Sequence, residues 1–120
     1  MNGRQDHHFR NPRSVTISAA AMKHARAFAK SVGGSEQGGR VVAFNWADQV
    51  SERDSLHETE RQLGACLMIG AYLRDQVPDE VVAVIDGVAL TVHVPDHAWP
   101  SPTRRLIDVD DAKPFGLTLR

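Results

Sequence analysis

Residues 81–94 read Val-Val-Ala-Val-Ile-Asp-Gly-Val-Ala-Leu-Thr-Val-His-Val, and this stretch decides the fold class. Two runs rich in β-branched residues flank Asp86-Gly87, a dipeptide typical of a two-residue hairpin turn, because both turn positions need a positive φ. Such a turn also sets the register, which pairs Ile85 with Val88, Ala83 with Leu90 and Val81 with Val92. These apolar side chains are expected to share the buried face of a β-ribbon. The other face is mixed, so it either meets solvent or contacts a partner.

The composition limits the classes to which the chain can belong. It has 120 residues, of which 42% are hydrophobic and 24% charged, as expected for one globular domain. The 14 basic and 15 acidic side chains nearly balance, so no nucleic-acid partner is predicted. No apolar run approaches the roughly 20 residues of a membrane span, and the N-terminal region lacks the apolar stretch of a secretory signal. We therefore expect a cytoplasmic protein without a membrane partner.

The chain divides into a short tail and a single domain. Residues 1–13, with a basic run from Arg4 to Arg13, are predicted to be a flexible polar tail, and residues 14–120 one folded domain. Ser18 can cap a helix over residues 19–32, in which apolar residues recur at helical spacing and form one stripe: Ala21, Met22, Ala25, Phe28, Ala29 and Val32. Glycines at positions 33, 34, 38 and 39 then predict a turn.

Alternation of apolar residues predicts the remaining elements. Strands are expected at residues 15–17, 40–46, 63–73, 106–109 and 115–119, in addition to the hairpin. Residues 47–62 are strongly polar and lack a clear period, so they are predicted to be an exposed loop. Trp46 and Trp99 are expected to pack in the core or a loop, with a role as partner anchors as the alternative. The sequence thus predicts an α+β fold in which an N-terminal amphipathic helix packs on a curled, mostly antiparallel β-sheet.

The order of these elements resembles the HesB-like family, the A-type iron–sulfur carrier proteins. The resemblance rests on residues 15–21 with the helix after them, on the Gly-Gly-Arg-Val-Val strand, on Val84-Ile85-Asp86-Gly87-Val88 and on the closing Phe115-Gly116-Leu117, and it covers roughly residues 14–119. It implies a small β-rich domain with one helix, formation of dimers or tetramers, and handling of iron or an iron–sulfur cluster. Its partners are expected to be proteins, among them iron–sulfur assembly components.

The sequence departs from the family at the positions that carry its chemistry. Family members bind clusters through three cysteines, one after the first long strand and two near the C-terminus, because thiolates are the preferred ligands of such clusters. Positions 47–51 contain no cysteine, and no C-terminal pair follows Leu119. Cys66 is the only cysteine and matches none of the three positions, so no cluster ligand is transferred from the family.

Other side chains are candidate ligands. Cys66 and His93 are candidates for binding a cofactor between subunits, although a buried cysteine is ordinarily a small hydrophobic residue. His93 and His97 are candidate metal ligands, but Pro95 between them excludes the shared helical face of a zinc motif. His57 is interpreted as a solvated loop residue, and the acidic residues at 108, 110 and 111 as a charged loop rather than a cation site.

Three hypotheses of function follow. The first is a non-catalytic adaptor or regulator related to iron–sulfur assembly, without conventional cluster ligation. The second is a nonconventional metal or cluster carrier that uses Cys66 and histidines at the interface of a homodimer. The third is a small enzyme with an unrecognised pocket, which has the least support because the chain contains neither a nucleophile elbow nor a phosphate-binding loop. The sequence therefore predicts that this chain is not an enzyme.

Overall fold

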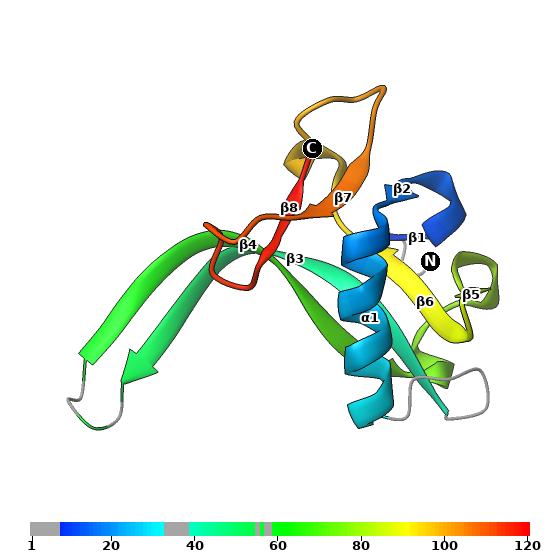
Figure 1. Ribbon diagram of the computed structural model, residues 1–120, viewed down its shortest axis with the longest axis horizontal. Helices are drawn as coiled ribbons and strands as arrows, with labels where there is room; N and C mark the ends of the chain where they lie inside the picture. Colours follow the sequence, from blue (N-terminus) through cyan, green and yellow to red (C-terminus); the bar gives the residue numbers. More distant parts are fainter. Residues whose placement is uncertain (1–7, 33–38, 55, 57–58) are drawn as a thin grey trace, which may run out of the picture.

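The computed structural model describes residues 8–32, 39–54, 56 and 59–120. In this part of the chain the fold is mixed α+β, with one α-helix, α1 (Ala19–Val32), against sheet-rich layers (Figure 1). The strands are β1 (Phe9–Arg10), β2 (Thr16–Ile17), β3 (Arg40–Asp54), β4 (Thr59–Leu73), β5 (Ala83–Ile85), β6 (Val88–His93), β7 (Leu106–Val109) and β8 (Leu117–Leu119). Short 3₁₀ helices connect them: η2 (Pro12–Ser14), η3 (Arg74–Gln76), η4 (Asp79–Val81) and η5 (Asp96–Ala98).

The strands form two sheets. The larger sheet has the order β1-β6-β3-β4, with β5 also paired to β6, and the smaller has the order β2-β7-β8. Two pairings are parallel, β3 with β6 and β2 with β7, and the others are antiparallel. The sheets are therefore mixed, because both parallel partners are brought together by long excursions of the chain rather than by tight turns.

The predicted hairpin is confirmed at its turn. Asp86 and Gly87 have φ values of 52° and 79°, and Ile85 pairs with Val88 and Ala83 with Leu90. The predicted pairing of Val81 with Val92 is wrong, since Val92 instead faces Arg10 of β1 and Val81 lies in η4. Pro78 begins this 3₁₀ turn, which shortens β5 and leaves room for β1 on the same edge of β6.

The helix is confirmed with its cap and its apolar stripe. The backbone N–H of Ala21 donates to Ser18 Oγ at 3.0 Å, as expected of an N-cap residue. Ala21, Met22, Ala25 and Ala29 are buried and pack against Phe44, Leu90 and Ile107 of the sheets in the main core. Trp99 also lies in this core, and Trp46 packs against it. No described helix is long and apolar enough to cross a membrane.

The opposite face of the large sheet carries a second, smaller core. Phe9, Val41 and Val77 are buried there, and Thr91 is fully buried with its hydroxyl donating to the Arg10 carbonyl at 3.2 Å. Residues 9–13, which the sequence assigned to a flexible tail, are therefore part of the folded structure. Residues 1–7 lie outside the described part, whereas Phe9–Arg10 and Pro12–Ser14 pack on β6, because Phe9 and Pro12 supply apolar surface that covers its mixed face.

The predicted loop at residues 47–62 is wrong for residues 47–54 and 59–62, which lie in strands; positions 55, 57 and 58 are outside the described residues. β3 continues to Asp54 and β4 begins at Thr59, so the two strands extend away from the body as a two-stranded arm (Figure 1). We use "arm" for residues 50–54 and 59–64. Opposite charges face each other across it, Glu52 opposite Arg61 and Arg53 opposite Glu60. Because most described arm side chains are exposed, the strands lack the apolar alternation by which a sequence reveals a half-buried strand.

Candidate functional site

The arm joins the body at an irregularity in the pairing of β3 with β4. Ala47 pairs with Cys66 and Val50 pairs with Gly64, so Asp48 and Gln49 lie opposite Ala65 alone. This is a β-bulge in β3, and a second register shift follows, because Val50 pairs with Gly64 and Ser51 with Gln62, which leaves Leu63 as an extra residue of β4. Gly64, next to Leu63, has a φ of 76°, which a glycine adopts without strain. Bulges bend a strand and redirect its side chains, so this position separates the buried part of the hairpin from the exposed arm.

A pocket of about 170 Å³ lies beside this bulge. Its walls come from three regions of the chain that are distant in sequence: Trp46 and Cys66 on the hairpin, Ala98 and Pro100 after β6, and Lys113 and Leu117 around β8. Most of the lining is apolar, and Lys113 supplies a positive charge. An apolar concave site with few polar groups is the usual form of a small-molecule binding site.

Asp48 connects two walls of this pocket. Its Oδ1 accepts hydrogen bonds from Trp46 Nε1 at 2.9 Å and from His97 Nε2 at 3.2 Å. The indole N–H of Trp46 and, second, His97 hold the pKa of the Asp48 carboxyl below its usual value, because both contacts favour the charged form. Asp48 therefore orients Trp46 on β3 and holds η5, which carries His97 and Ala98, against the same strand.

Cys66, a candidate ligand from the sequence, is buried with 4% of its surface exposed. Its thiol lies 3.7 Å from the carbonyl oxygen of Gly64 and 3.9 Å from that of Leu63, and the residue contributes to the wall of the pocket. This environment is that of a small apolar side chain within a packed strand.

His93, the second candidate, lies on the opposite face of the sheet from α1, in a polar cluster with Asn45 and Tyr72. The Tyr72 hydroxyl donates to Asn45 Oδ1 at 2.9 Å and lies 3.3 Å from His93 Nδ1. The Tyr72 hydroxyl therefore joins Asn45 of β3 to His93 of β6. The His93 ring also stacks on the Phe9 ring, with the two ring centroids 4.3 Å apart. Burial of Tyr72 raises the pKa of its hydroxyl.

His97 contacts Asp48, whereas His93 contacts Tyr72, so the two histidines have different partners. Within residues 8–32, 39–54, 56 and 59–120, no group of three or more His, Cys, Asp or Glu side chains is arranged to hold a metal ion. The structure thus distributes Cys66, His93 and His97 over different surroundings. A site made of these residues requires a contribution from outside the described residues of one chain.

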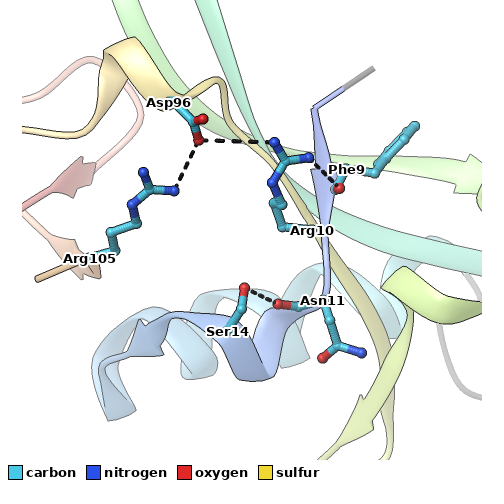
Figure 2. A network of polar contacts seen from close by, with 6 residues as sticks. All are labelled: Phe9, Arg10, Asn11, Ser14, Asp96 and Arg105. Carbon is cyan, nitrogen blue, oxygen red and sulfur yellow. Dashed lines mark hydrogen bonds and ion pairs between the residues drawn. The ribbon is translucent and has the colours of Figure 1, made fainter. Parts of the chain in front are cut away.

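A separate network anchors the N-terminal segment to the body (Figure 2). Asp96 Oδ1 lies 3.1 Å from Arg105 Nη1 and 4.0 Å from Arg10 Nη2, and Arg10 Nη1 donates to the Phe9 carbonyl at 2.9 Å. The Arg105 guanidinium also lies 5.4 Å from the centre of the Trp99 ring. These contacts hold β1, η5 and the segment before β7 together, and η5 is the element that carries one wall of the pocket.

Comparisons with protein-family models, curated proteins and solved structures gave no match. The HesB-like resemblance therefore remains a prediction from the sequence.

Sequence reasoning identified Cys66, His93 and His97 but missed Asp48 and Lys113. Both lie in polar segments without a recognised motif, Asp48 in the predicted loop and Lys113 in the turn before β8. The adjacent Trp46 was the available signal, since an aromatic residue followed two positions later by a carboxylate on an extended strand places both side chains on one face.

Proposed function

We propose that this chain is a HesB-like, iron–sulfur-assembly-related protein that acts as a non-catalytic adaptor and contacts its protein partners through the β3–β4 arm. The observation that carries the proposal is the arm itself. It extends beyond the body as two paired strands whose outer surfaces are mostly exposed (Figure 1). Neither the main nor the second apolar core includes residues 50–54 or 59–64. Packing of the body therefore does not require the arm.

The edges of the arm support a role in binding proteins. Within the described residues, β4 pairs only with β3, and β3 pairs with β6 only over residues 42–45. Exposed strand edges present unpaired N–H and C=O groups that an extended segment of another protein can bind by adding a strand. The opposite charges along the arm limit unspecific association, because an incoming strand must match their pattern.

The HesB-like part of the proposal rests on the sequence resemblance over roughly residues 14–119. The single helix packed on a sheet and the Asp86-Gly87 turn are compatible with it. The proposed architecture includes a curled sheet, and the proposed setting is the cytoplasm. Iron–sulfur assembly components are the proposed partners, and a homodimer is the oligomeric form to test.

Shortening the arm tests the proposal. Replacing residues 52–61 by Asn-Gly joins Ser51 to Gln62, which already face each other, through a two-residue turn. We expect this variant to keep the thermal stability of the body and to lose binding to iron–sulfur assembly proteins of the host. A control variant, Glu52→Arg with Arg61→Glu, keeps the arm and the charge pair but reverses its direction. Equal capture of the same partners by the shortened variant and the full chain would contradict an adaptor role of the arm.

Reconstitution with iron and sulfide distinguishes the adaptor from the alternative, a cluster carrier that uses Cys66. An adaptor gives a colourless protein, in wild type and Cys66→Ser alike. A stable coloured form that is lost in Cys66→Ser would overturn the adaptor proposal, since Cys66 is the only cysteine of the chain.

A further inference from the structure

We infer that the pocket at the base of the arm binds a small aromatic carboxylate, a ligand with one planar ring and one carboxylate. This inference does not depend on the adaptor role, since it concerns a different surface of the protein. It rests on the size of the pocket, on its walls and on its charge.

The size of the pocket suits one ring. Its volume is about 170 Å³. An engineered apolar cavity of about 150 Å³ in another protein binds benzene, so a single six-membered ring fits this pocket. A monocyclic ligand is therefore the class that we assign to it.

The walls favour a planar apolar group. Trp46 lies on one side, and Pro100 and Pro114 contribute further rigid ring surfaces. The bond from the Trp46 indole to Asp48 at 2.9 Å holds the indole in place before any ligand arrives, so little conformational entropy is lost on binding. Aromatic groups gain from offset or edge contacts with an indole in addition to burial.

The charge favours an anion. Lys113 is the only charged residue in the pocket lining, and none of the ion pairs among the described residues involves it. A carboxylate on the ring therefore meets an ammonium that does not have to leave another partner. Asp48, the carboxylate that holds Trp46, is hydrogen-bonded to Trp46 and His97 and does not line the pocket.

Titration of the full chain with benzoate, followed by amide NMR shifts and tryptophan fluorescence, tests the inference. We expect saturable shifts confined to the lining residues. Benzamide, which keeps the ring but lacks the charge, should bind about fivefold more weakly than benzoate. In Lys113→Gln the ratio of the two dissociation constants should fall to about one. Cyclohexanecarboxylate should bind more weakly than benzoate, because it lacks the planar ring.

Two further measurements keep the test independent of tryptophan fluorescence. Ala65 lines the pocket from an exposed position, so Ala65→Phe should fill the pocket without disturbing the core and abolish binding. Cys66 is the only thiol and also lines the pocket, so benzoate should slow its alkylation in wild type and not in Ala65→Phe. Absence of saturable benzoate shifts in wild type, or equal affinity for benzoate and benzamide, would overturn the inference.

Discussion

The substitution Gly70→Ala tests the polar cluster on the second face of the large sheet. A Cβ added at Gly70 would lie 2.6 Å from Asn45 Nδ2, which is closer than real Cβ contacts allow. Gly70 lies opposite Ala43 on β3, with Asn45 two positions further along that strand. The Asn45 side chain therefore occupies the space that only a glycine leaves open.

The expected change in the free energy of unfolding follows from the hydrogen bond and the rotamer that Asn45 would lose. Moving its amide away from the new methyl group breaks the 2.9 Å hydrogen bond from Tyr72, a loss of about 1 kcal/mol. Forcing the side chain off its rotamer adds about 0.5–1.5 kcal/mol. Replacing glycine by alanine in extended backbone also raises the free energy of unfolding by about 0.4–1 kcal/mol, because it reduces the conformational entropy of the unfolded chain. We therefore expect Gly70→Ala to lower the free energy of unfolding by about 0.5–2 kcal/mol.

A double-mutant cycle separates the steric contact from other effects. In an Asn45→Ala background no side chain opposes the new methyl group, so Gly70→Ala should there raise the free energy of unfolding by about 0.4–1 kcal/mol. Urea denaturation followed by circular dichroism of the four proteins measures both values. The sign of the effect should thus reverse between the two backgrounds. An equal loss of stability in both would refute the reasoning, because it would show that Asn45 does not fill the space beside Gly70.

Three other predictions concern the bulge, the core and the pocket. Gly64→Ala should lower the free energy of unfolding by about 1–2 kcal/mol through backbone strain alone, since Gly64 has a φ of 76° and no atom within 4 Å of an added Cβ; unchanged stability in urea would contradict the bulge conformation. Ile107→Ala should lower the free energy of unfolding by about 2–5 kcal/mol, because Ile107 on β7 of the small sheet is fully buried in the main core with residues of α1, and a loss below about 1 kcal/mol would argue against this packing. Because the pKa of Asp48 is lowered in the folded state, its charged form stabilises the fold at pH values above the usual aspartate pKa of 3.8, and this stabilisation is lost as the pH falls through the lower pKa of the folded state. The difference in Tm between wild type and Asp48→Asn should therefore shrink at acid pH. A difference that stays constant across the acid range would show that the hydrogen bonds from Trp46 and His97 do not stabilise the charged form.

Elements with local causes could be predicted from the order of the residues. Asp86-Gly87 can adopt positive φ at both positions, and Ser18 can cap the helix that follows it, whatever the rest of the chain does. The helix over residues 19–32 could also be predicted, because it buries one face and such burial leaves a periodic pattern in the sequence. For β6 the sequence predicted the apolar face of Val88, Leu90 and Val92, but not that Ala89 and Thr91 on the other face are buried as well.

The arm, the position of β1 and the candidate pocket depend instead on contacts between distant parts of the chain. The arm buries little apolar surface, so its strands have no period that a sequence can reveal, and they are held by pairing with each other. β1 is two residues long and becomes a strand only where β6 offers a free edge. The pocket is formed by segments near residues 46, 66, 98 and 113, which are far apart along the chain. Contacts between distant segments depend on how the sheets pack, and no local spacing of residues encodes that geometry.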